Sequence, residues 1–348
     1  MSVHTKKKRI EEIKGVSYTV PNKYLFGLSF LIYFIPAAIR YGIGQDYFYT
    51  YIPMFNYIRN DSISIYTNET IQYNEIGFNL LNKSIAALTD DPQWLIAITS
   101  LFCLVLAFIC IRDYSPDVVQ SVFILTLGSY YVASYSLIRQ AMAIAIFAFA
   151  LRYIENGKTV KFMLCIALAA TLHTASIVYV PFYFVARMKF TKKQYLAISL
   201  SSILGIRLLS TLIVKIVSLT RFAGRISFSG DYNLIQAGVI FMIFALAVLG
   251  MDSEVKDDKY RIYVNLLFVS ACLIGLEPVL DTTDRLIYMF YYTNFITLPY
   301  IIKRGNWGER RKTVVLTIYG LLAVLWWHEN LYYDQDSVLP YASILSQR

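Results

Sequence analysis

"QWLIAITSLFCLVLAFICI", residues 93–111, is a stretch of 19 residues without a single charged side chain. An α-helix rises about 1.5 Å per residue, so this stretch would be about 28 Å long, close to the thickness of the hydrocarbon core of a bilayer. Its length and composition therefore predict a transmembrane helix.

Similar apolar stretches recur along the whole chain, and their predicted bounds are 24–39, 118–136, 138–156, 161–186, 195–214, 233–250, 261–280, 286–302 and 313–328. Hydrophobic residues make up 57% of the 348 residues, charged residues only 16%, and the mean hydropathy is +0.50. A soluble domain of this size cannot carry so much apolar surface. We predict an all-α, polytopic integral membrane protein of about 10–11 transmembrane helices in a single domain, residues 1–348.

The basic residues that give the net charge of +9 lie between the apolar stretches. They form no patch with interleaved aromatic residues, so we expect no nucleic-acid partner. The positive-inside rule instead places these segments, and the N-terminus, in the cytoplasm. No small-residue cleavage site follows the basic start, so residues 1–23 are predicted to be a retained cytoplasmic tail.

Residues 40–92 then form the first external loop. Within it, "NEIGFNLLNKSIAAL", residues 74–88, places Phe78, Leu81, Ile85 and Leu88 on one face of a helix, as is typical of a helix that lies in the membrane interface. The four cysteines lie in apolar stretches without metal-ligand spacing, so we expect no disulfide framework, no metal site and no cofactor.

Residues 161–186 have basic residues at both ends, Lys161 and Arg187, which a single crossing would place on opposite sides of the membrane. Two short arms that meet at His173, at membrane depth, would keep both ends in the cytoplasm and require a cavity open to the outside. The alternative is one long, tilted helix in which His173 is hydrogen-bonded inside the bundle. The charge pattern leaves both interpretations open.

Four polar motifs occur in order: "IRYGIGQDYFYTY" (39–51), "NEIGF" (74–78), "SLIRQAMAIAIFAFALRYI" (136–154) and "KFMLCIALAATLHTASIVYVPFYF" (161–184). They resemble the successive motifs of the EpsG family, Wzy-like polymerases of bacterial O-antigen and exopolysaccharide assembly. The resemblance covers about residues 36–186, and the C-terminal half is similar only in general character, with "DRLIYMFYY" (284–292) as its best motif.

This resemblance implies a glycosyltransferase of the GT-C type in the bacterial inner membrane that works on the periplasmic face. Such an enzyme joins oligosaccharide repeat units carried on undecaprenyl diphosphate, and the diphosphate lipid is the leaving group. A polysaccharide chain-length regulator is a further partner to consider. The alternatives are a lipid-linked oligosaccharide flippase and an O-antigen ligase.

Breaking a glycosyl–phosphate bond leaves negative charge on the diphosphate, which a guanidinium stabilises with paired hydrogen bonds. Arg139 in the "IRQ" motif is the first candidate for this role, with Gln140 beside it, and its alternative is an arginine that snorkels to the interface. Arg40 either binds phosphate or braces Asp46. Further candidates are Arg221, Arg225 and Arg285.

The attacking hydroxyl needs a group that accepts its proton. Asp46 lies just outside the first apolar stretch between glycines and tyrosines, and GT-C enzymes often carry an acid in this loop, so we predict it to be the base. Its alternative is turn chemistry, in which the carboxylate caps its own backbone. His173 is the rival base, and Glu75 is a helix-start residue that orients others. Nearby tyrosines either stack on sugars or belong to an interfacial aromatic belt.

Overall fold

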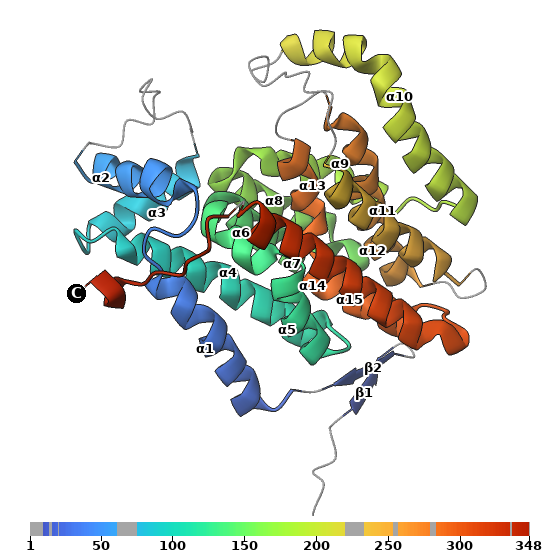
Figure 1. Cartoon of the computed structure of the whole chain (residues 1–348), viewed down its shortest axis with the longest axis horizontal. Coiled ribbons are helices and arrows are strands. Elements are labelled where there is room, and N and C mark those ends of the chain that lie inside the picture. The colour runs from blue at the N-terminus through green and yellow to red at the C-terminus, as the bar shows by residue number, and fades with distance from the viewer. Residues whose placement is uncertain are drawn as a thin grey trace, which may run out of the picture.

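The computed structural model describes residues 10–13, 16–19, 21–60, 75–219, 233–252, 257–278, 283–334 and 336–347. The body is entirely helical in these ranges, as predicted (Figure 1). One short antiparallel pair, β1 (Ile10–Ile13) and β2 (Val16–Thr19), was not predicted and lies in the N-terminal tail, to one side of the helical body.

The α-helices are, in chain order, α1 (Lys23–Ile39), α2 (Ile52–Asn60), α3 (Ile76–Ala86), α4 (Gln93–Tyr114), α5 (Val118–Leu127), α6 (Tyr130–Ser136), α7 (Ile138–Glu155), α8 (Thr159–Leu172), α9 (Tyr179–Val185), α10 (Lys192–Ser218), α11 (Leu234–Leu249), α12 (Asp258–Leu273), α13 (Thr283–Tyr291), α14 (Asn294–Arg304) and α15 (Arg311–Trp327). Short 3₁₀ or π segments extend some of them. Each predicted apolar stretch corresponds to one of these helices or to a consecutive pair, because a long uncharged run has no other way to satisfy its backbone in lipid.

Three continuous helical segments of the described chain are long and apolar enough to cross a membrane, namely Gln93–Tyr114, Asp258–Leu276 and Gly308–Tyr332. The pair α5 and α6, bent by 42°, provides a fourth if it forms one span. Shorter apolar helices accompany them, including α1, α8 and α11. These helices are consistent with a multi-pass membrane protein, and they account for fewer full-length spans than the predicted 10–11.

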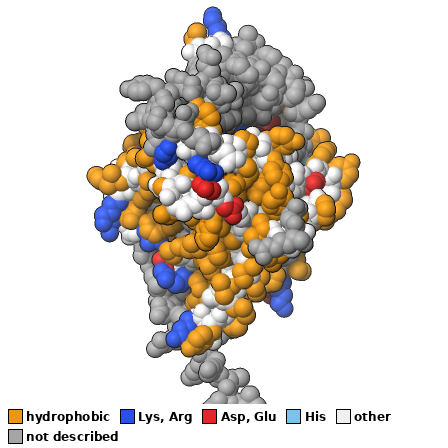
Figure 2. Space-filling view, turned by 90° about the vertical axis from the view of Figure 1, so that its left-hand side faces the viewer, with side chains coloured by type: hydrophobic (Ala, Val, Ile, Leu, Met, Phe, Trp, Pro, Cys, Tyr) orange, Lys and Arg blue, Asp and Glu red, His pale blue; other side chains and the backbone are white. Residues whose placement is uncertain are grey.

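Hydrophobic side chains also cover much of the outside of the protein. Figure 2 shows a largely apolar face on the side where α1, α2 and α3 lie, with charged side chains in only a few places. On α1, the exposed residues include Leu25, Leu28 and Ile32. By contrast, almost every side chain of α7 is buried, because this helix runs through the centre of the fold and contacts α4, α8, α12 and α13. The residues at the start of α7 are therefore surrounded by packed side chains of neighbouring helices.

The chain breaks at His173, which has an extended backbone (φ −150°, ψ 107°) between α8 and the 3₁₀ turn η2 (Thr174–Val178) that leads into α9. The hydroxyl of Thr159, at the start of α8, is hydrogen-bonded to that of Tyr183, near the end of α9. In one continuous helix these residues would lie about 36 Å apart. The interpretation as one long helix is therefore wrong, and the break into two short arms at His173 is confirmed, whereas the depth of these arms in the membrane stays a prediction.

The predicted helix at residues 74–88 is confirmed as α3, but its apolar face does not lie in the membrane interface. Phe78 and Ile85 are buried inside the protein, whereas Ile76 and Leu80 are exposed. Gly77 explains the close approach of α3 to α8, because a Cβ atom at this position would lie 2.3 Å from the Thr171 hydroxyl oxygen. The loop helix is thus packed against the first of the two arms.

After α15 the chain continues through a π turn, η6 (His328–Tyr332), and then crosses to the side of α1 (Figure 1). There the Tyr41 N–H donates to the Ala342 carbonyl at 3.0 Å, and Arg40 pairs with Ser343 in an isolated β-bridge. The C-terminal segment therefore covers the loop that contains the predicted base, Asp46.

The hairpin of α8 and α9 predicts that both of its outer ends face the cytoplasm. Single cysteines at Lys158 and Lys189, which are both exposed, should react with a membrane-impermeant maleimide only from the cytoplasmic side, and Tyr49→Cys, on the first external loop, only from the outside. The four native cysteines are free and buried or half-buried, so the unsubstituted protein gives the background. Labelling of positions 158 and 189 from opposite sides would contradict the half-helix arrangement.

Candidate active site

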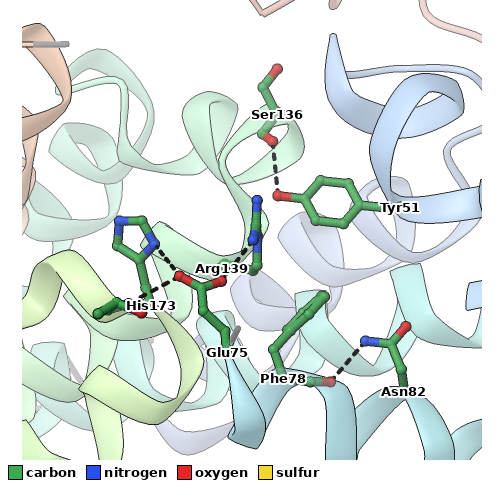
Figure 3. A network of polar contacts seen from close by, with 8 residues as sticks. Tyr51, Glu75, Phe78, Asn82, Ser136, Arg139 and His173 are labelled. Atoms are coloured by element: carbon green, nitrogen blue, oxygen red, sulfur yellow. Dashed lines mark hydrogen bonds and ion pairs between the residues drawn. The ribbon is translucent and has the colours of Figure 1, made fainter. Parts of the chain in front are cut away.

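A buried carboxylate, Glu75, joins three segments that are far apart in the sequence (Figure 3). Arg139 Nη1 donates to Glu75 Oε2 at 2.7 Å, and the Thr174 N–H donates to Oε1 at 2.9 Å. His173 Nδ1 lies 3.1 Å from the same Oε1. The three segments are the start of α3, the start of α7 and the break between α8 and η2. Glu75 is only 4% exposed, so these bonds are formed away from bulk water.

The charge state of Glu75 follows from its surroundings. Burial alone would raise the pKa of its carboxyl, but the hydrogen bond with His173, the charge of Arg139 and the bond from Thr174 outweigh burial, so the pKa lies below its usual value. Glu75 is therefore ionised at neutral pH and can only accept hydrogen bonds. In a neutral imidazole this fixes the proton of His173 on Nδ1 and leaves the lone pair on Nε2.

Arg139 does not snorkel to the membrane interface, because it is only 8% exposed and is paired with Glu75. Its guanidinium lies 5.9 Å from the ring centre of Phe78 and also interacts with the hydroxyl of Tyr51. Tyr51 donates in turn to the carbonyl of Ser136 at 3.3 Å (Figure 3). Arg139 is thus held between the Glu75 carboxylate on one side and the Tyr51 hydroxyl on the other.

Asp46 lies at the start of the π turn η1 (Tyr47–Tyr51), which ends at Tyr51. Burial raises the pKa of the Tyr51 hydroxyl, the charge of Arg139 lowers it and the charge of Asp46 raises it, so both charges lie within electrostatic range of one hydroxyl. Asp46 is half-buried and accepts a hydrogen bond from Thr50 Oγ1 at 3.2 Å. It makes no side-chain capping bond to the turn, so the predicted alternative, in which it caps its own backbone, is not found.

The glycines before Asp46 set the position of its loop. Gly44 has φ +100°, and a Cβ atom there would lie 2.3 Å from the carbonyl oxygen of Tyr135. Only glycine accepts this conformation and this close approach without strain. The next residue, Gln45, donates its N–H to Ser136 Oγ at 3.1 Å. The loop is therefore docked on the residues that directly precede α7, which brings Asp46 to the same end of α7 as Arg139.

Arg40 has a different environment from the one predicted. It is fully buried, donates to the Ala37 carbonyl and to Ser100 Oγ, and stacks over the ring of Tyr135. The described residues contain no ion pair between Arg40 and Asp46, so the interpretation that Arg40 braces Asp46 is wrong. Because Arg40 is fully buried, its guanidinium offers no exposed surface for a direct contact with phosphate in this structure.

The remaining predicted residues divide into two groups. Gln140 is buried and its side-chain amide donates to the Arg285 carbonyl at 2.7 Å, which ties the start of α13 to the start of α7. The side chain of Arg285 is exposed on α13. Arg221 and Arg225 lie outside the residues that the structure describes.

Glu329 is a buried acid that the sequence analysis did not select. Its carboxylate accepts hydrogen bonds from Ser129 Oγ at 2.8 Å and from the Tyr288 hydroxyl at 2.9 Å. These contacts tie the π turn η6 to α13 and to the start of α6. The available signal was its position in "VLWWHENLYY", where an acid at the end of an apolar stretch suggests a buried polar contact.

The tyrosines of the predicted external loop also separate into two kinds. Tyr47 and Tyr51 are buried in the protein, and Tyr49 is exposed, as an aromatic belt residue would be. A pocket of about 300 Å³ adjoins the Asp46 turn, lined in part by Tyr41, Tyr47 and Phe48. Aromatic rings beside the turn therefore border a space of a size that can hold part of a small-molecule ligand.

A family model described as the EpsG family matches residues 23–343 of this chain, which is nearly its whole length. The match extends through the C-terminal half, where the sequence motifs are sparse. No curated protein and no solved structure matches the chain.

Proposed function

The chain belongs to the EpsG family, and we propose that it is a polysaccharide polymerase of O-antigen or exopolysaccharide assembly. It joins undecaprenyl-diphosphate-linked oligosaccharide repeat units on the periplasmic face of the bacterial inner membrane. The proposal includes a GT-C-like arrangement of 10–11 membrane segments, some of them half-helices, and a cytoplasmic N-terminus. The observation that carries it is the buried site in which Glu75 holds both Arg139 and His173.

Arg139 is suited to stabilise the leaving diphosphate. A guanidinium carries five N–H donors in a planar fork that matches phosphate oxygens, and in Arg139 this fork is oriented by the bond to Glu75. The site around Arg139 is largely shielded from water, which strengthens its attraction for the charge that develops on the diphosphate. Glu75 keeps the guanidinium in one orientation before the substrate arrives, so little reorganisation is needed during the reaction.

Asp46 is the proposed base of the transfer. A hydroxyl oxygen of the acceptor unit attacks the anomeric carbon of the donor, a new glycosidic bond forms and the bond from that carbon to the diphosphate oxygen breaks. The hydroxyl proton passes to the Asp46 carboxylate, and the electron pair of the broken bond leaves with the diphosphate. The turn that begins at Asp46 ends at Tyr51, and the Tyr51 hydroxyl contacts Arg139, so this short turn connects the proposed base with the guanidinium.

His173 supports this arrangement from the other side of Glu75. Its Nδ1 is bound to the carboxylate, and in the described residues its Nε2 has no hydrogen-bond partner. It is therefore the second candidate for the proton acceptor, and a positioning residue for Glu75 if Asp46 is the base.

The decisive experiment uses the purified full-length protein in proteoliposomes with one defined undecaprenyl-diphosphate-linked repeat unit. A polymerase should produce a ladder of products and release one diphosphate lipid for each linkage formed. A protein that only moves the substrate across the bilayer would form no new bond, and one that transfers a single chain to a lipid A core would form no ladder. Absence of a ladder from active, folded protein with its own repeat unit would contradict the proposal.

A further inference from the structure

A second pocket, of about 520 Å³, is formed where four segments end or begin. All of its lining residues come from the C-terminal half of the chain, after residue 188. The segments are the loop before α10, the end of α11, the start of α12 and the end of α14. Its size is in the range of sites that bind small molecules or headgroups. The predicted topology places all four of these segments in the cytoplasm, so the pocket opens on the side opposite to the proposed active site.

The lining of this pocket is rich in positive charge. Its charged residues are Lys189, Lys192, Arg261, Arg304, Asp252 and Asp257. Four cations and two carboxylates leave a net charge of +2 on the lining. One carboxylate, Asp257, is already engaged, because it accepts from Arg304 Nε at 3.0 Å and from the Tyr300 hydroxyl.

The two lysines are the cations best placed to bind an added anion. Lys192 Nζ donates to the Leu249 carbonyl at 2.9 Å, which fixes its ammonium group at the edge of the pocket and leaves two of its three donors. Among the described residues, neither Lys189 nor Lys192 has a carboxylate partner. An anion that entered the pocket would therefore meet two ammonium groups that are not paired with a carboxylate in the described part of the chain.

Apolar surface borders this charged pocket. Phe190, Met251 and Tyr260 contribute to its lining. Next to it, Met188 and Leu249 are exposed, and along α10 the exposed residues include Ile198. A ligand that combines an anionic group with hydrocarbon chains can thus place the anion in the pocket and the chains along the outside of α10 and α11.

We propose that this pocket binds the phosphate-bearing headgroup of an anionic phospholipid in the cytoplasmic leaflet, with Lys189 and Lys192 as the main contacts to the phosphate. Basic pockets between helix ends on the cytoplasmic side are suited to such headgroups. The apolar surroundings favour a lipid over free phosphate, because only the lipid also covers the exposed side chains. The bound lipid would hold the ends of α11, α12 and α14 together.

The test is lipid binding to the purified full-length protein in mild detergent, followed by native mass spectrometry. The wild-type protein should bind phosphatidylglycerol more tightly than phosphatidylcholine with the same acyl chains. Each lysine near an anionic headgroup contributes a factor of about five, so Lys189→Gln with Lys192→Gln should weaken phosphatidylglycerol binding about 30-fold. Lys189→Gln alone should weaken it about fivefold and serves if the double variant does not fold.

The matched control is Lys158→Gln with Lys161→Gln, which removes the same charge from exposed lysines on the same predicted side but outside the pocket. It should bind phosphatidylglycerol like the wild-type protein. Inorganic phosphate at the same concentration should not compete with the lipid. Equal binding of both lipids, unchanged binding by the pocket variants, an equal loss in the control or competition by phosphate alone would each overturn the proposal. None of these measurements depends on the polymerase activity.

Discussion

Polymer formation should fall by about 10²- to 10³-fold when Arg139 is replaced by lysine, the loss typical of removing one preorganised charge-stabilising donor. Lysine keeps the positive charge but has no planar fork, so it cannot bind Glu75 and present paired donors to a diphosphate at once. The substitution also removes the contact with Tyr51. Because the charge next to Glu75 is kept, the buried carboxylate is not left unpaired and the protein should still fold.

The measurement is the rate of ladder formation by purified protein, with membrane levels as the folding check. Arg59→Lys is the matched control, because Arg59 lies on α2 in the same external loop and forms a largely exposed ion pair with Asp90. It should polymerise at close to the wild-type rate. A wild-type rate in Arg139→Lys would mean that the guanidinium fork has no part in binding the diphosphate.

The helices were predictable from sequence because each depends on a local property. An apolar run long enough to cross most of a bilayer must form a helix, whatever surrounds it. The break at His173 was accessible for the same reason, since Lys161 and Arg187 both obey the positive-inside rule only if the chain turns back. The short apolar helices α8 and α11 mark the limit of this approach. Apolar composition alone does not determine how far a short helix extends into the membrane.

The contacts of the site could not be derived in this way. Glu75 and Arg139 are 64 residues apart and meet only because α3 packs on α8 beside the start of α7. The sequence suggested that Glu75 orients other residues, but not that it holds both Arg139 and His173. The environment of Arg40 was mistaken for a related reason, since two of its side-chain partners, Ser100 and Tyr135, lie far from it in the sequence.

Replacing Asp46 by asparagine should lower the polymerisation rate by about 10²- to 10⁴-fold, the usual effect of removing a general base. Asparagine has nearly the same shape and can still accept a hydrogen bond from Thr50, so the loop docked by Gly44 should keep its structure. It cannot take a proton at neutral pH. Substrate binding should therefore persist, and the loss should appear in kcat with little change in KM.

The control variant is Asp90→Asn, which removes an exposed acid from the same loop and should leave the rate unchanged. Rescue by formate distinguishes a base at position 46 from a residue with a purely structural role. If Asp46 accepts the proton, Asp46→Ala should recover part of its activity when formate is added, because a small carboxylate can occupy the vacated space. A near wild-type rate in Asp46→Asn would refute this assignment. His173 would then be the base, since its Nδ1 is held by Glu75 and its Nε2 has a lone pair available, and His173→Gln should show the loss expected here for Asp46.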